Sequence, residues 1–500
     1  MDLQTIWYGF SIGLQPMNLV YCFIGVLLGT LVGVLPGIGP VGAISLLLPS
    51  TFRMDPVGAI IMLAGIYYGS MYGGSTTSIL VNIPGEATSV VTCIDGHQMA
   101  IKGRAGAALG IAAFGSFIAG TLGLVGLMLF AQPLASFALR FGPPEYFAVL
   151  TLGLTLITYL SQGSIIKSII MGAFGIALGC VGIDTIMGSP RMVFNVYLLD
   201  GIDIVPVAVG LFGVSEVLLN IEEDAKLELL DVKMEFLSFF PTIKDWIKSK
   251  GAIIRGSILG FFLGILPGGG AIVATFLSYA IEKRISKEPE LFGKGAIEGV
   301  AGPEAANNAA SAGAFVPLLT LGIPTNAIMA LLFGAFMIHG VRPGPFLLST
   351  HPELFWGVIS SMYIGNVLLL VLNLPLIPVW VQILKIPQRI LLPLILLFCL
   401  LGSYSTNNRI FDVFLMAVFG ILGYLFKKFN YESAPLILAF VLGPMFESSL
   451  RQSLLLSNGS LLIFFARPIS AVTLTITLAL LAISVVPFFR KKKGVINDTG

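Results

Sequence analysis

Two clusters of hydroxyl and amide side chains interrupt apolar sequence at corresponding places in the two halves of the chain. Each cluster ends at a proline break, and the members are Ser75, Thr76, Thr77, Ser78, Asn82, Pro84 and Gly85, then Asn307, Asn308, Ser311, Pro324, Thr325 and Asn326. Such breaks free backbone N–H groups at the starts of half-helices, where partial positive charge binds anions without a buried cation. Because Lys and Arg are almost absent from these stretches, the clusters predict a binding site for an anionic substrate. The alternative is that the hydroxyls only join helices to one another.

Two glycine-rich breaks upstream of these clusters offer ligands for a coupling ion. Broken membrane helices expose backbone carbonyl groups, which are the usual ligands of a coupling Na⁺, and the candidates are Gly37, Gly39, Gly268 and Gly270. Coupling to H⁺ would instead need a carboxylate within the membrane. Glu304, beside Pro303, is the leading candidate, and Glu86, after Pro84 and Gly85, is the second. For both acids the alternative is a carboxylate at the start of a helix near the membrane surface.

The breaks and the clusters belong to an internal repeat. The motif that opens with Gly29 and Gly33 and continues through Leu35 to Gly39 recurs 231 residues later, from Gly260 to Gly270. The polar clusters recur at an offset of 240, so that Gly73 corresponds to Gly313 and Pro84 to Pro324. Matched, Gly/Pro-interrupted apolar segments in two halves of a chain are typical of the substrate site of a secondary transporter.

Nothing in the sequence indicates an enzyme or a resident cofactor. The segment Gly37 to Gly42 formally matches the GxGxxG dinucleotide fingerprint, but that fingerprint requires a preceding strand and a βαβ unit, which an apolar membrane segment does not supply. The four cysteines are scattered without paired spacing, and no metal-ligand pattern or pairing of a nucleophile with a base occurs. We therefore expect no catalytic residues, no metal other than a coupling Na⁺, and no nucleic-acid partner.

Composition places the chain in the membrane. Of the 500 residues, 56% are hydrophobic and 11% charged, and the mean hydropathy is +0.95. Apolar runs of spanning length recur along most of the chain, which predicts an all-α polytopic membrane protein with roughly 11–12 transmembrane helices. The arms around the first break, Val20 to Leu35 and Val41 to Leu48, are shorter than a full span. We therefore also expect two re-entrant hairpins, one in each repeat, with their tips shielded by protein or a water-filled cavity.

Basic residues predict the orientation of the two repeats. Loops near residues 95–104 and 283–294 are rich in Lys and Arg, whereas the loops near 50–56 and 341–352 that correspond to them are not. Basic loops stay in the cytoplasm, so the two copies would have inverted topology. The basic segment Arg490 to Lys493 predicts a cytoplasmic C-terminus.

The same reasoning divides the chain into six parts. They are an N-terminal interfacial or first helix (1–19), repeat 1 with its hairpin and spans (20–198), a cytoplasmic connector region (199–250), repeat 2 with its hairpin and spans (251–380), additional C-terminal spans (381–489) and a cytoplasmic basic tail (490–500).

Several long motifs resemble a known family. They run from Gly29 to Gly39, Tyr72 to Leu80, Asn82 to Glu86, Asp95 to Ala100 and Glu298 to Asn308, and continue with Gly322-Ile323-Pro324 and Pro343-Gly344-Pro345. Over essentially its whole length the chain resembles the large membrane subunit of the tripartite tricarboxylate transporters (TctA-type).

The resemblance implies an ion-gradient-coupled secondary transporter that imports di- or tricarboxylates such as citrate across the bacterial cytoplasmic (inner) membrane. It also implies an extracytoplasmic solute-binding protein and a small four-helix membrane subunit as partners, with Na⁺ expected as the coupling ion and H⁺ as the alternative. A TRAP-type or stand-alone dicarboxylate transporter is the nearest alternative function, and an anion channel is a more distant one.

Overall fold

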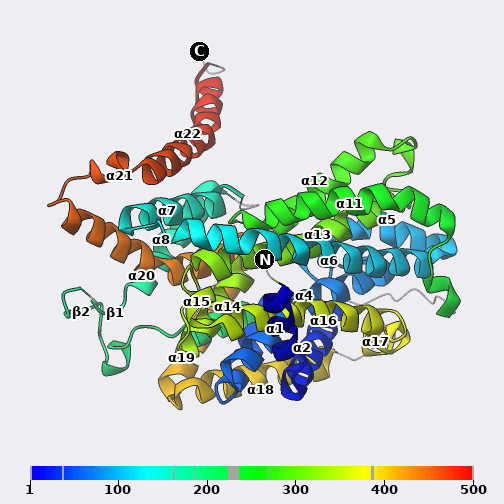
Figure 1. Ribbon diagram of the computed structural model, residues 1–500, viewed down its shortest axis with the longest axis horizontal. Coiled ribbons are helices and arrows are strands. Elements are labelled where there is room, and N and C mark those ends of the chain that lie inside the picture. The colour runs from blue at the N-terminus through cyan, green and yellow to red at the C-terminus, as the bar shows by residue number, and fades with distance from the viewer. Residues whose placement is uncertain are drawn as a thin grey trace. The chain divides into compact units, whose positions relative to one another are not determined.

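The computed structural model describes residues 3–35, 39–160, 164–184, 186–222, 236–268, 270–384 and 388–497 (Figure 1). Contacts between its helices divide the chain into two compact units, one of residues Met1–Ser136 and Asp203–Phe429 and one of Phe137–Ile202 and Asn430–Gly500. The prediction that Gly37 binds an ion falls outside the described residues. The connector is described only up to residue 222 and again from residue 236.

The first unit holds the Gly/Pro-broken segments of both repeats, whereas residues 137–198, assigned to repeat 1 from the sequence, belong to the second unit. Its N-terminal half contains α1 (Leu3–Gly13), α2 (Pro16–Val34), α3 (Gly39–Leu47), α4 (Pro56–Val81), a short 3₁₀ turn (Ala87–Ser89), α5 (Val90–Met99) and α6 (Ala105–Ala138), which ends at the boundary between the units. The rest contains α9 (Ile204–Ala208), α10 (Ser215–Glu222), α11 (Ile243–Ile265), α12 (Gly270–Ile285), α13 (Glu298–Leu321), α14 (Ala327–Ile338), α15 (Leu347–Thr350), α16 (Pro352–Asn373), α17 (Ile377–Ile383), α18 (Gln388–Asn407) and α19 (Ile410–Lys428).

The second unit is built around packed helices and one small hairpin. Its elements are α7 (Pro143–Leu160), α8 (Ile165–Gly179), β1 (Gly182–Ile183), β2 (Pro190–Arg191), α20 (Ser433–Leu456), α21 (Ile463–Ala466) and α22 (Pro468–Asn497). α8 packs against α20, and β1 pairs with β2 in antiparallel fashion.

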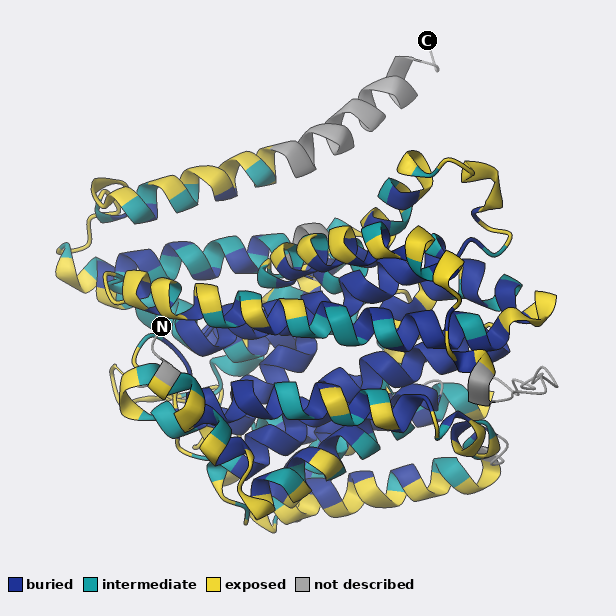
Figure 2. Cartoon of the chain, turned by 45° about the vertical axis from the view of Figure 1, so that its right-hand side comes forward, coloured by how far each residue is buried: buried dark blue, intermediate teal, exposed yellow. Residues whose placement is uncertain are grey.

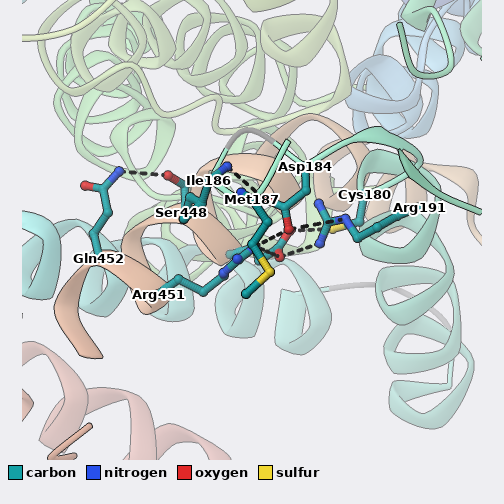
Figure 3. Close-up of polar contacts among 9 residues, drawn as sticks. Cys180, Asp184, Ile186, Met187, Arg191, Ser448, Arg451 and Gln452 are labelled. Atoms are coloured by element: carbon teal, nitrogen blue, oxygen red, sulfur yellow. Dashed lines mark hydrogen bonds and ion pairs between the residues drawn. The ribbon is translucent and has the colours of Figure 1, made fainter. Parts of the chain in front are cut away.

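Ion pairs tie the hairpin of the second unit to α20 (Figure 3). Arg191 donates to the Glu447 carboxylate at 2.5 Å, and Arg451 donates to Asp184 at 2.6 Å and to Glu447 at 3.0 Å. Asp184 also accepts the backbone N–H groups of Ile186 and Met187. The hydrogen bond from Arg451 lowers the pKa of Asp184 to about 2.

The helices confirm an all-α polytopic membrane protein. Among the described residues, 8 helices are long and apolar enough to cross a membrane by length and composition, and four shorter apolar helices accompany them. Their lengths differ from some expectations. The first hairpin arm begins at Pro16, because proline is well tolerated at the start of a helix, and so α2 reaches 19 residues. Residues 204–222, assigned to the connector from the sequence, also form a helical segment of spanning length.

The sequence repeat is also a repeat of helix packing. α2 packs against α4, and α11 packs against α13, through glycines where an added Cβ would lie within 3.0 Å of a carbonyl oxygen on the partner helix. The contacts are Gly25 with Met62, Gly29 with Ile66 and Gly33 with Ser70, and then Gly256 with Gly302, Gly260 with Ala306 and Gly264 with Ala310. The glycines are again 231 residues apart, and their partners 240. Small residues permit such close approach of membrane helices. The inverted orientation of the two copies stays a prediction.

The second helix of each repeat ends in the same conformation. Asn82 follows α4 with φ 59°, and Gly322, 240 residues later, follows α13 with φ 69°. Both residues are left-handed, which terminates a helix and favours glycine or asparagine. The proline breaks therefore occupy equivalent positions in the two repeats.

Candidate functional site

The two helices that carry the predicted clusters have no exposed face. Every residue from 58 to 81 of α4 and from 299 to 320 of α13 is buried, and Figure 2 shows such buried residues as continuous dark-blue stretches of helix. A helix that is buried all round belongs to the interior of a protein, where each polar side chain needs a partner.

The first contact between the two halves joins α4 and α5 to Glu304 of α13. The hydroxyl of Ser75 donates to Oε2 of Glu304 at 2.6 Å, and the hydroxyl of Thr92 donates to Oε1 of the same carboxylate. Glu304 is 1% exposed. Its carboxylate therefore lies in the protein interior.

The second contact joins the first break to Asn307, one helical turn beyond Glu304. The Thr88 hydroxyl lies 2.7 Å from Oδ1 of Asn307 and also contacts Oε2 of Glu86. Asn307 Nδ2 lies 3.4 Å from Oε1 of Glu86. A hydroxyl has one hydrogen to donate, so the Thr88 hydroxyl cannot donate to both oxygens. Thr88 therefore lies between Glu86 and Asn307 and links the first break to α13.

Within the described part of the chain, neither buried carboxylate has a basic partner. Among the described residues, no ion pair includes Glu86 or Glu304. An isolated buried charge costs several kcal/mol, and an ionisable residue within a membrane protein marks an ion or substrate pathway. The pair can therefore hold a proton or balance the charge of a bound cation.

The N-caps at the two breaks differ in charge. Glu86 accepts the backbone N–H of Thr88 at 2.6 Å and caps the short 3₁₀ turn. Asn326, 240 residues later, caps α14 by accepting the N–H of Met329 at 2.9 Å. A carboxylate already occupies the first half-helix start and would repel an anion there. The second start is uncharged, and the adjacent Thr325 hydroxyl is buried without a hydrogen-bond partner.

Several of the other predicted substrate residues donate hydrogen bonds within the protein. Asn308 donates to the Ser116 hydroxyl at 2.7 Å, and Ser311 donates to the carbonyl of Asn307. The Thr77 hydroxyl donates to the Val34 carbonyl at 2.6 Å, at the end of α2. Ser78 is buried without a partner, and Asn82 is exposed.

The predicted glycine ligands lie at helix ends. Gly39 and Gly270 begin α3 and α12. The backbone N–H of Gly268 donates to the carbonyl of Thr325 at 2.8 Å, which joins the two breaks of the second repeat. Gly85 packs so closely on α2 and α4 that an added Cβ would lie within 3.0 Å of Gly33 and Gly74. Pro84 and Pro324 occupy the breaks themselves.

Three hydroxyl residues and one acid at the site were absent from the sequence prediction. The missed hydroxyls are those of Thr88, which contacts Glu86, of Thr92, which contacts Glu304, and of Ser116, which contacts Asn308. The spacing of Thr88 and Thr92, one helical turn apart, could have indicated the first two. Asp95 of α5, fully buried, accepts the N–H groups of Gly293, Gly295 and Ala296 at 2.7–2.9 Å and the Tyr279 hydroxyl at 2.9 Å. It joins α5 to the loop before α13.

One family model and several uncharacterized relatives match the chain. The model of the Tripartite tricarboxylate transporter TctA family matches residues 19–438. An uncharacterized 52.8 kDa protein from the TAR-I ttuC′ 3′ region of Agrobacterium vitis is 51% identical over 495 residues, which cover 99% of this chain and 98% of that protein. An uncharacterized Methanocaldococcus jannaschii protein, MJ1079, is 25% identical over 54% of this chain and 63% of its own length. No solved structure matches the chain.

Proposed function

Because the chain belongs to the tripartite tricarboxylate transporter TctA family, a family of transporters and not of enzymes, we propose that it is the translocating membrane subunit of a binding-protein-dependent, ion-coupled importer of di- and tricarboxylates. The observation that carries this proposal is the hydrogen-bonded contact between the two halves, in which Ser75 and Thr92 meet Glu304 while Thr88 links Glu86 to Asn307. A buried polar contact between two Gly/Pro-broken repeats is the arrangement expected of a transporter site.

The uncharged break of the second repeat is the proposed contact for a substrate carboxylate. The start of α14 supplies backbone N–H groups and a partial positive charge. Thr325, whose hydroxyl has no partner, and Asn326 would add hydrogen-bond donors. The Glu86 carboxylate disfavours an anion at the first break. The two breaks would thus serve different ligands.

The two buried acids are the proposed link to the ion gradient. Glu86 and Glu304 have no basic partner among the described residues, so a cation or a proton is needed to stabilise them in the interior. We take Na⁺ as the coupling ion and H⁺ as its alternative, as expected from the resemblance. Release of the ion would leave buried negative charge and would disfavour a return without substrate.

The partners and the cellular location follow from the family and the basic loops. The family name implies further subunits, and the proposed ones are a small four-helix membrane subunit and an extracytoplasmic solute-binding protein. The distribution of basic residues supports inverted repeats and a cytoplasmic C-terminus. The proposed location is the bacterial inner membrane.

Uptake of labelled citrate and a panel of dicarboxylates into proteoliposomes tests the proposal. The reconstituted complex with its partner subunits would be supplied with an inward Na⁺ gradient or with a proton gradient alone. Saturable accumulation driven by one gradient is expected. Equilibration without accumulation, unaffected by either gradient, would refute coupled transport and favour a channel.

Two substitutions test whether the substrate carboxylate and the coupling ion use different residues. Thr325→Val removes one hydroxyl from the proposed carboxylate contact and should raise KM by about tenfold or more, since a hydrogen bond to a charged group contributes about 1.5–3 kcal/mol. Glu304→Gln keeps the shape but removes the ionisable group, and should abolish accumulation while leaving exchange. Thr320→Val is the matched control, because its hydroxyl bonds only the Val316 carbonyl of its own helix. A Thr325→Val variant with the KM of wild type would refute the assignment of the carboxylate.

A further inference from the structure

A small cavity lies beside the carboxylate of Glu304, between α4, α6 and α16. Its volume is about 10 Å³, which is room for about one water molecule. The polar side chains in its wall are Tyr72, Ser75, Thr76, Ser116 and Asn373, and the remainder of the wall is Leu109, Ala112 and Ala113. Every polar group in the wall is an oxygen-bearing side chain, and none is basic.

Three of these side chains donate a hydrogen bond to a group other than the cavity wall. The Tyr72 hydroxyl donates to Oδ1 of Asn366 at 2.6 Å, and the Ser75 hydroxyl donates to Glu304 at 2.6 Å. The amide Nδ2 of Asn373 donates to the Leu369 carbonyl at 3.0 Å. These three lining residues, Tyr72, Ser75 and Asn373, therefore each have an oxygen that can still accept a hydrogen bond or ligate a cation.

Asn373 supplies an independent indication of a missing ligand. The residue is 4% exposed, and its Oδ1 is buried without any hydrogen-bond partner. An unpaired buried acceptor of this kind costs about 1–3 kcal/mol. A water molecule or a cation would satisfy it, and a cation would also use the lone pairs of the Tyr72 and Ser75 oxygens. A cation can be ligated by all of them together.

The charges near the cavity favour a cation. The hydroxyl of Ser75, a residue of the cavity wall, donates to Glu304. Among the described residues, Glu304 has no basic partner. Asn373 is the last residue of the 22-residue helix α16. The C-terminal end of a helix carries partial negative charge. Both features lower the electrostatic cost of a positive ion and raise that of an anion.

We infer that this cavity is a binding site for one Na⁺ ion, ligated by oxygens of Tyr72, Ser75, Thr76, Ser116 and Asn373, with the Glu304 carboxylate as its counter-charge. Hard monovalent and divalent cations are held by oxygen ligands of this kind. The inference deepens the proposed transport function and rests on it for its physiological role. It places the ion at side chains of three helices, away from the glycine carbonyls of the breaks. Ser75 then joins the ion to Glu304, at the contact between the repeats.

Thermal unfolding of the purified full-length chain tests the site without any transport. The midpoint would be measured from tryptophan fluorescence in NaCl, KCl and choline chloride at constant ionic strength. A ligand that binds only the folded state raises the midpoint saturably, so Na⁺ should stabilise the protein above the choline control. Equal midpoints in Na⁺ and choline would show that the cavity holds water only, and would overturn the inference.

Substitutions of Asn373 locate the ion. Asn373→Leu should raise the apparent Kd for Na⁺ at least tenfold, whereas Asn373→Asp keeps an oxygen and should retain the Na⁺ response. Ser70→Ala is the matched control, because Ser70 is buried on α4 and its hydroxyl bonds only the Tyr67 carbonyl. If Asn373→Leu does not fold, Ser116→Ala takes its place. A wild-type Na⁺ response in the folded variant would place the ion elsewhere.

The two proposals fail in different ways. Specific Na⁺ stabilisation that depends on Asn373, with no gradient-driven uptake, would preserve the cation site and refute coupled transport. Accumulation driven by protons, with no Na⁺ effect on unfolding, would preserve transport and refute the site.

Discussion

The glycines between α11 and α13 make a specific prediction about stability. In Gly260→Ala the new Cβ would lie within 3.0 Å of the carbonyl oxygen of Ala306 and 2.7 Å from its C and Cα atoms. All three are backbone atoms of a helix that is buried on every side, so no flexible side chain can move away. Overpacking of this kind costs about 1–3 kcal/mol, and against it the better helix propensity of alanine contributes about 1 kcal/mol.

Because the clash is with backbone, we take the overpacking cost at the upper end of its range, about 3 kcal/mol. After the gain of about 1 kcal/mol from helix propensity, Gly260→Ala should destabilise the protein by about 2 kcal/mol. Gly29→Ala, its equivalent in the first repeat, should behave alike, since its Cβ would lie 2.5 Å from the Ile66 carbonyl oxygen. The matched control is Gly115→Ala in α6, where the nearest atom would be 3.6 Å away. That variant should be as stable as wild type or slightly more stable.

The assay is the midpoint of thermal unfolding in detergent, with size-exclusion chromatography to confirm a monodisperse sample. Midpoints that fall for Gly260→Ala and Gly29→Ala, but not for Gly115→Ala, are expected. If Gly260→Ala matched wild type, the close packing of α11 on α13 would be incorrect. An equal loss in Gly115→Ala would show that any glycine substitution destabilises the chain, and would refute the repeat-specific reasoning.

Three further predictions concern single side chains. Asp95→Asn should lower the free energy of unfolding by about 3 kcal/mol or more, and with it the unfolding midpoint, because hydrogen bonds to a carboxylate contribute about 1.5–3 kcal/mol each and Asp95 accepts four; an unchanged midpoint would contradict this role. Because the folded-state pKa of Asp184 is lowered to about 2, its contribution to stability should be complete above about pH 4 and lost as the pH falls toward 2. The difference in midpoint between wild type and Asp184→Asn should therefore shrink below pH 4, and a constant difference would refute the ion pairing. Thr77→Val should cost about 1 kcal/mol of stability by losing its bond to the Val34 carbonyl, with KM for substrate unchanged; a raised KM would support the sequence prediction that Thr77 binds substrate.

The packing of the repeats could be predicted from sequence because glycine is required where two helix backbones touch. Gly29, Gly33, Gly260 and Gly264 were visible as a repeated motif, and the structure places each of them against a carbonyl of the neighbouring helix. The proline breaks were predictable for a similar local reason, since proline removes a backbone donor. These features depend on backbone chemistry at single positions and can therefore be predicted from the sequence without the tertiary structure.

The partners of the hydroxyl groups could not be predicted, because they depend on which helices meet. Thr77 and Ser75 are two residues apart on α4, yet one bonds α2 and the other bonds Glu304 of α13. The polar segment Tyr404 to Arg409, whose Ser, Thr and Asn residues favour a loop, is helical up to Asn407, because packing and local hydrogen bonds outweigh weak helix propensity. Asn373 carried no sequence signal at all, and its unpaired oxygen is apparent only from the three-dimensional arrangement.

The two repeats share their packing but not their chemistry. At the offset of 240, Glu304 corresponds to Ala64, and Ser75 corresponds to Phe315. The first break has Glu86 where the second has Asn326. Glu86 is joined through Thr88 to Asn307, one helical turn beyond Glu304, whereas the equivalent position at the other break is uncharged.

Such an arrangement suits the transport of an anion together with a cation. A cation bound near Glu304 would be attracted to the two acids, whereas a substrate carboxylate would be repelled by them and attracted to the start of α14. Since Gly268 bonds the Thr325 carbonyl, the anion contact is joined to the break between α11 and α12. Neutralisation of the acids by a cation would then lower the barrier to binding the anion, which is the physical requirement for coupling the two ligands. We therefore expect that in Glu304→Gln the binding of Na⁺ no longer changes the affinity for the carboxylate. The measurement compares the binding of each ligand alone with its binding in the presence of the other.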